Sequence, residues 1–117
     1  MQKAEWVRLA EYRIRLVTAP YFLATKLEAF HGRGRNDYAI SHDLEDIVTV
    51  IDGRLELVTE ISLEPADLRQ YLSAEFRALL STAAFRDALP GHLLPDAASQ
   101  QRISIVIDRI QQIINLS

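Results

Sequence analysis

The chain has 117 residues, of which 49% are hydrophobic and 25% charged, and it contains no cysteine. This composition predicts one globular domain and excludes disulfide scaffolds, thiolate metal sites and cysteine nucleophiles. The net charge of -3 argues against a general nucleic-acid or anionic-membrane binder. No apolar run reaches the length of a membrane span or forms a signal-peptide core, so we expect a soluble, cytoplasmic protein.

The N-terminal part of the chain predicts a short strand. Tyr12, Ile14 and Leu16 are apolar and alternate with arginines, as in a half-exposed strand over 12–17. A single strand leaves half of its backbone groups without hydrogen bonds, and the rest of the chain predicts no second strand. Unless the strand prediction is wrong, its sheet belongs to a partner chain or to a further N-terminal part.

Two helices are expected between residues 18 and 53. Pro20 suits a first helical turn, and apolar residues then recur three or four positions apart. Gly32 and Gly34 predict that this helix ends in a loop, while Ser41 is a strong N-cap candidate for the second helix. The second helix has acidic first turns and stops at Gly53. Its apolar stripe consists of Leu44, Ile47, Val48 and Ile51.

The next part of the chain predicts short helices on either side of a long one. A helix over 54–61 is expected to turn Leu55 inward, together with Val58 and Thr59 or Ile61. A longer helix begins after Pro65, which suits a helix start. A further short helix is expected over 83–89.

A proline-rich loop and a final helix complete the predicted fold. The loop contains His92, which we expect to be exposed. The final helix begins near residue 96 or 99 and ends at Ile114, with isoleucines on one broad face that Ile105 widens. A face of this breadth needs cover, either from the rest of the bundle or from a second chain in a homodimer.

The expected fold is therefore mainly α, a bundle of about five helices with a short N-terminal β-strand, in a single domain over 1–117. Its segments are a lead-in over 1–17, a helix-loop-helix over 18–53 that carries the candidate motifs, and a helical bundle over 54–117. Between Asp43 and Asp67 the sequence holds eight acids and only one base, Arg54. A surface facing nucleic acid would not have this charge, so we expect no nucleic-acid partner.

Polar residues are concentrated between Lys26 and Asp46. The simplest interpretation is a solvated loop and helix start, because each acid in a first helical turn is stabilised by about 0.3–1 kcal/mol. Three more specific interpretations assign a binding or catalytic role to these residues. They are a phosphate cradle of Gly32, Arg33, Gly34 and Arg35, a divalent metal site of His42, Asp43 and Asp46, and a triad of Ser41, His31 and Asp37.

Three features follow one another between residues 18 and 52. A Lys-Leu-x-Ala sequence over 26–29 lies in a predicted helix, Arg33 or Arg35 follows it, and the acidic helix start HDLEDI comes next. In this order the segment resembles the C-terminal half of nucleotidyltransferase-fold proteins of the abortive-infection AbiEii/AbiGii toxin type. After residue 53 the agreement is limited to helical character.

The resemblance implies a mechanism and a set of site residues. Proteins of this type transfer a nucleotidyl group from a nucleoside triphosphate with a divalent metal, usually magnesium. The family's lysine corresponds to Lys26, which would lie against the triphosphate and offset its charge. The later family aspartate, which positions the acceptor or takes part in base chemistry, corresponds to Asp43 or Asp46. Asp37 competes for that position.

The resemblance also implies what the chain does not supply. The family holds its metal with an Asp-x-Asp pair after a Gly-Gly or Gly-Ser motif in the N-terminal half, and this sequence has neither. We therefore expect a C-terminal domain that is inactive alone, binds no cofactor alone, and needs a missing N-terminal half or a partner chain that brings magnesium. Arg33, Arg35 and Asp37 would help to bind the substrate. The alternative functions are a helical interaction module and a small enzyme or metal binder on its own.

Overall fold

The computed structural model describes residues 18–34 and 37–117, and this part of the chain is mainly helical, as predicted. The predicted strand over 12–17 lies outside the described residues. The longer helices are α2 (Ala19–Ala29), α3 (His42–Gly53), α5 (Ala66–Ser81) and α8 (Ile103–Ile114). The shorter ones are α4 (Leu57–Ser62), α6 (Ala83–Ala88) and α7 (Ala97–Gln100). None of the described helices has the length and apolar character needed to cross a bilayer.

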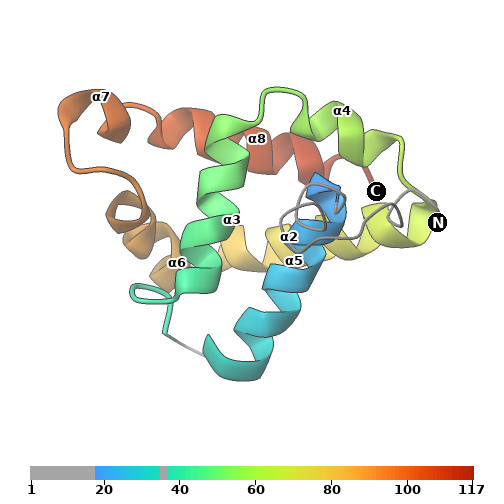
Figure 1. Ribbon diagram of the computed structural model, residues 1–117, viewed down its shortest axis with the longest axis horizontal. Helices are drawn as coiled ribbons and strands as arrows, with labels where there is room; N and C mark the ends of the chain where they lie inside the picture. Colours follow the sequence, from blue (N-terminus) through green and yellow to red (C-terminus); the bar gives the residue numbers. More distant parts are fainter. Residues whose placement is uncertain (1–17, 35–36) are drawn as a thin grey trace, which may run out of the picture.

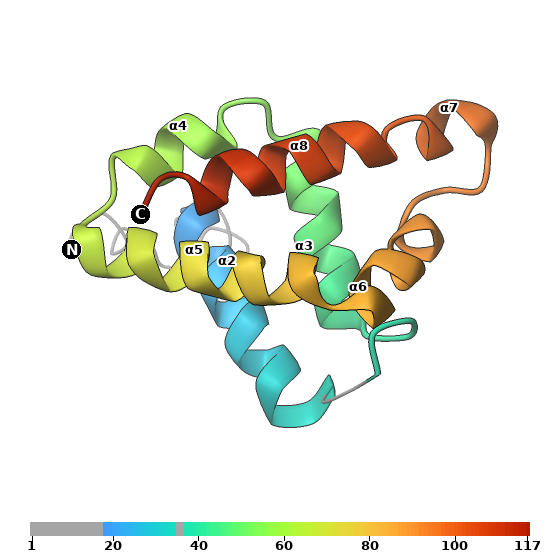
Figure 2. The ribbon, with the colours of Figure 1, turned by 180° about the vertical axis from the view of Figure 1, so that it is seen from behind.

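The longer helices form two layers. Helices α5 and α8 lie side by side in one layer, and α2 and α3 cross them in the other (Figure 1). Seen from behind, α5 and α8 are in front and α2 and α3 lie beyond them (Figure 2). Helices α2 and α3, which carry the candidate motifs, therefore share one layer and pack directly against each other.

A single apolar core fills the space between the layers. Most members of the predicted apolar stripes contribute to it, because residues three or four apart share one helix face. The fully buried side chains come from every longer helix and from several short ones. The largest of them are Phe76, Phe85, Leu23, Leu27, Leu44, Ile47, Ile51, Leu57, Ile61, Leu72, Leu89 and Ile110.

The first described helix continues further than the glycines predict. Helix α2 begins after Thr18 with Pro20 in its first turn, as expected, but the residues Phe30–Gly34 prolong it as a π-helical turn. The prediction that residues 31–34 form a loop is therefore wrong. A Cβ added at Gly32 would contact nothing within 4 Å, so this position needs no glycine for packing. Burial of Phe30, which is only 3% exposed, holds the π turn against the core.

Two other predictions of helix position need correction. Helix α4 begins at Leu57 rather than at residue 54, and this shift rotates its inward face. Leu57 and Ile61 are buried one turn apart, while Leu55 precedes the helix and is 79% exposed. The predicted final helix is divided into α7 and α8, because the Asp96 cap and the turn at Arg102 give each its own start.

His92 is buried, contrary to the expectation that its loop would expose it. Its exposed fraction is 8%, and it lies in a 3₁₀ turn over Leu89–His92 that follows α6. The ring Nε2 lies 2.7 Å from the carbonyl oxygen of Tyr38. Since a carbonyl oxygen can only accept, Nε2 donates, and the histidine fixes the turn that precedes α3.

Candidate functional site

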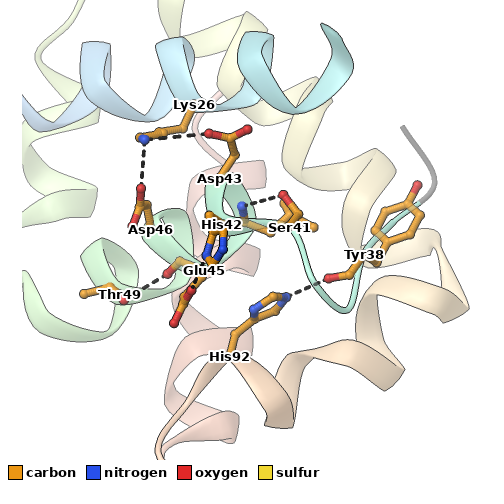
Figure 3. Close-up of polar contacts among 10 residues, drawn as sticks. Lys26, Tyr38, Ser41, His42, Asp43, Glu45, Asp46, Thr49 and His92 are labelled. Atoms are coloured by element: carbon orange, nitrogen blue, oxygen red, sulfur yellow. Dashed lines mark hydrogen bonds and ion pairs between the residues drawn. The ribbon is translucent and has the colours of Figure 1, made fainter. Parts of the chain in front are cut away.

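Three of the predicted site residues meet between α2 and α3. The Nζ atom of Lys26 lies 2.8 Å from Oδ2 of Asp46 and 3.6 Å from Oδ1 of Asp43. Lys26 extends from α2 toward the first turns of α3, and both aspartates point back at it (Figure 3). We call Lys26, Asp43 and Asp46 the lysine cluster.

The packing of α2 on α3 explains why these residues meet. Leu23 and Leu27 of α2 are fully buried, as are Leu44 and Ile47 of α3, so the helix faces that carry them are in contact. Lys26 lies beside Leu27 at the edge of this contact. Asp43 and Asp46 are three positions apart on α3, a spacing that places both on one side of the helix.

The start of α3 is fixed by the predicted cap. The Ser41 hydroxyl accepts a hydrogen bond of 3.2 Å from the backbone N–H of Leu44, and Asp43 follows in the first turn. Unpaired N–H groups give this end of a helix a partial positive charge. This charge stabilises the carboxylate of Asp43, as does the ammonium group of Lys26.

The members of the lysine cluster differ in their exposure. The side chain of Asp43 is 5% exposed, that of Lys26 24%, and that of Asp46 46%. The ammonium group of Lys26 also lies 5.5 Å from the centroid of the Phe22 ring, which makes a weak cation–π contact. A ligand can therefore reach Lys26 and Asp46 from solvent, whereas Asp43 is covered by its neighbours.

The other predicted substrate-binding residues are not part of this cluster. Asp37 is exposed just before the turn over 38–40, and it lines a surface pocket together with Ala84 and Asp87 of α6. Arg33 belongs to the π turn by its backbone, and its side chain, like the whole of Arg35, lies outside the described part. Of the three candidate aspartates, Asp43 and Asp46 therefore lie at Lys26, and Asp37 lies elsewhere.

Two of the alternative sites are not assembled. The side chain of His42 is 92% exposed and its Nδ1 lies 3.1 Å from Glu45, not from Asp43 or Asp46. Within residues 18–34 and 37–117, no group of three histidine or acidic side chains is placed to hold a metal ion. The catalytic triad does not form either, because Ser41 is a helix cap and His31 binds Glu75 on α5.

The structure also reveals polar contacts between α2 and α5 that the sequence did not indicate. His31 Nε2 lies 2.5 Å from Oε1 of Glu75, and the hydroxyl of Tyr71 donates to Glu28. Burial, and next the hydrogen bond to Glu28, raise the pKa of Tyr71 above its ordinary value. Sequence periodicity identifies helices but not which of them pack together, so it contained no signal for these pairs.

Comparisons with known proteins identify no relative. No family model, no curated protein and no solved structure matches the chain.

Proposed function

We propose that this helical domain is the C-terminal part of a nucleotidyltransferase-like protein of the AbiEii/AbiGii toxin type, in which Lys26 contacts the triphosphate. One observation carries the proposal. Lys26 and the acidic start of α3 are separate in the sequence, and they meet within 2.8–3.6 Å. Two of the three sequence features behind the resemblance therefore lie side by side.

The different exposure of the two aspartates supports distinct roles for them. A contact between exposed charges contributes only about 0–1 kcal/mol, so the ammonium of Lys26 can exchange Asp46 for a phosphate oxygen at little cost. Asp43 is covered and lies at a helix N-terminus, so it stays in place and keeps Lys26 oriented. Asp46 is then the carboxylate that an acceptor can reach, and Asp43 is a positioning residue.

The described residues do not fit a resident metal ion, since no suitable group of ligands is present among them. In this proposal, carboxylates of a partner chain or a preceding domain would hold the magnesium ion. The ion would accompany the nucleoside triphosphate and neutralise part of its charge. The chain alone would then bind phosphate groups through Lys26 without transferring a nucleotide. Because it depends on nucleoside triphosphates, the proposed function belongs in the cytoplasm.

Calorimetric titration with ATP, with and without magnesium, tests this function. We expect weak binding by the wild-type chain, its loss in Lys26→Ala, and no transfer of a labelled nucleotide. Arg77→Ala is the matched control, because Arg77 is an exposed cation on α5 outside the lysine cluster. Binding that survives in Lys26→Ala, or disappears equally in Arg77→Ala, would contradict the proposal, as would its absence from the wild type.

A second candidate function is a helical interaction module, including a homodimer. It is favoured by large apolar side chains that the fold leaves exposed, above all Leu55 and Leu63 on either side of α4, which are 79% and 81% exposed. Ile105, on α8, is 37% exposed. Sedimentation at high concentration distinguishes the candidates: self-association weakened by Leu63→Ser supports the module, and a monomer at every concentration excludes the dimer.

A further inference from the structure

A pocket away from the lysine cluster lies between the π-helical turn after α2 and the C-terminal half of α5. This pocket has a volume of about 260 Å³ and is lined in part by Phe30, His31, Tyr38, Glu75 and Leu79. Ligand pockets usually measure roughly 300–1,000 Å³, so this one suits a single ring system rather than a larger molecule. Neither Lys26 nor its two aspartates lines it.

One wall of the pocket is aromatic. The ring centroids of Phe30 and Tyr38 are 5.3 Å apart and their planes are tilted by 55°, at a centroid separation typical of favourable aromatic pairs. Phe30 is held by the core, and the backbone of Tyr38 is held by its hydrogen bond from the buried His92. The wall is therefore formed before any ligand arrives, which lowers the entropic cost of binding.

The pocket also contains one charged acceptor. Oε1 of Glu75 accepts a hydrogen bond from Nε2 of His31, at 2.5 Å, and the side chain of Glu75 remains 24% exposed. Its other oxygen, Oε2, makes no hydrogen bond within the described part of the chain. Glu28, on α2, accepts from Tyr71, which lies one turn before Glu75 on α5, so this acidic neighbourhood favours a cationic or N–H-bearing group.

The π-helical turn brings the aromatic and charged parts together. Phe30 and His31 are consecutive residues at the start of this turn, with Phe30 directed into the core and His31 54% exposed beside Glu75. Such π turns persist at a cost in backbone hydrogen bonding and often occur at functional sites.

From this geometry we infer that the pocket binds a small planar aromatic ring that carries amino or amidinium N–H donors at its edge. The ring packs against Phe30 and Tyr38, and the N–H groups donate to Oε2 of Glu75. His31 keeps the carboxylate of Glu75 in position through Oε1. This site does not depend on the proposed role of Lys26.

Titration of the 15N-labelled chain with benzamidine, followed by NMR, tests the inference, because benzamidine joins a planar ring to an amidinium group. We expect a dissociation constant on the order of 1 mM, as is typical of a ligand with so few atoms. The amide signals of His31, Tyr38 and Glu75 should shift. Benzoate, which has the same ring and the opposite charge, should leave these signals unchanged.

A pair of variants separates a defined site from general attraction to acidic residues. Glu75→Gln should weaken benzamidine binding about tenfold or more, because it removes the charged acceptor. Glu28→Gln removes the same charge nearby without altering the pocket, and it should change the affinity less than twofold. Equal losses in both variants, binding of benzoate, or no benzamidine shifts at these residues would overturn the inference.

Discussion

The two ends of α3 are both held by long-range contacts to basic residues, but the contacts differ in kind. At the C-terminal end, Nη1 of Arg109 donates to the carbonyl oxygens of Ile51 and Asp52, at 2.7 Å each. Arg102 donates to the side chain and the carbonyl of Asp52. At the N-terminal end, the Lys26 ammonium group pairs with the side chains of Asp43 and Asp46, and that of Asp46 is exposed.

The contacts of the two arginines are structural, whereas those of Lys26 can be exchanged for contacts with another anion. The last carbonyl groups of a helix need donors, so the two arginines complete the hydrogen bonding of α3 and tie it to α8. At the other end the Ser41 hydroxyl accepts from the backbone N–H of Leu44, and Lys26, whose ammonium group has only donors, cannot pair with the remaining N–H groups. Lys26 is thus not needed to finish the helix, and its ammonium can turn to another anion.

The largest effect is expected at the C-terminal end of α3. Arg109→Ala removes two charge-assisted hydrogen bonds to partly buried carbonyls and should lower the free energy of unfolding by about 2–3 kcal/mol. Urea denaturation measures this change. Arg77→Ala, which removes an exposed arginine from α5, should change the same quantity by less than about 0.5 kcal/mol. Similar values for both variants would contradict a structural role for Arg109.

A smaller effect is expected at the covered half of the lysine cluster. Asp43→Asn keeps the shape of the side chain but removes the charge that faces Lys26 and the helix N-terminus, which should cost about 1–2 kcal/mol. Asp46→Asn should cost less than about 0.5 kcal/mol, because Asp46 is far more exposed. Urea denaturation measures both losses. A larger loss of unfolding free energy in Asp46→Asn than in Asp43→Asn would show that the exposure of the two carboxylates does not determine their roles.

Lys26→Ala should lower the free energy of unfolding by no more than about 1 kcal/mol. The closer partner of Lys26 is the exposed Asp46, and Asp43 keeps the stabilisation that it receives at the start of α3. Thermal and urea unfolding of this variant give the value. A loss of several kcal/mol would make Lys26 a structural residue like Arg109 and would remove the contrast between the two ends of α3.

The smallest effect concerns a cap near the C-terminal end of α3. Asp96 caps α7, which precedes Arg102, and its hydrogen bonds with Ser99 lower the pKa of the carboxyl below its ordinary value. The folded state therefore favours the charged form, and this stabilisation is present above the ordinary pKa and is lost as the pH falls through the lowered value. Asp96→Ser should reduce the acid sensitivity of unfolding, measured between pH 5 and pH 2, while an unchanged profile would contradict the charged cap.

The sequence was sufficient to predict the helices whose apolar residues follow a regular period. Leu44, Ile47, Val48 and Ile51 were expected on one face and are all buried, and the Ser41 cap is confirmed. The prediction failed where a local signal competed with packing. The glycines after Phe30 indicated a loop, yet burial of Phe30 continues the helix as a π turn.

The candidate site was predictable only in part, because the sequence identifies charged residues but not how the helices pack. The charges of Lys26, Asp43 and Asp46 could be identified from the chain, but their contact depends on how α2 packs on α3. The pair of His31 and Glu75 depends in the same way on the packing of α2 against α5, and nothing in the sequence indicates it. The burial of His92 was missed because its partner, the Tyr38 carbonyl, is a backbone atom of a distant turn.

The most direct test of the exchangeable lysine uses the fact that the chain has only two lysines, Lys3 and Lys26. Selective 15N-lysine labelling therefore gives two side-chain signals, and Lys26→Ala assigns them. On titration with tripolyphosphate, we expect the Lys26 signal to shift in a saturable manner and to a larger extent than that of Lys3, and saturation should come earlier in Asp46→Asn. A Lys26 signal that stays in place, or follows Lys3 without saturation, would contradict the account.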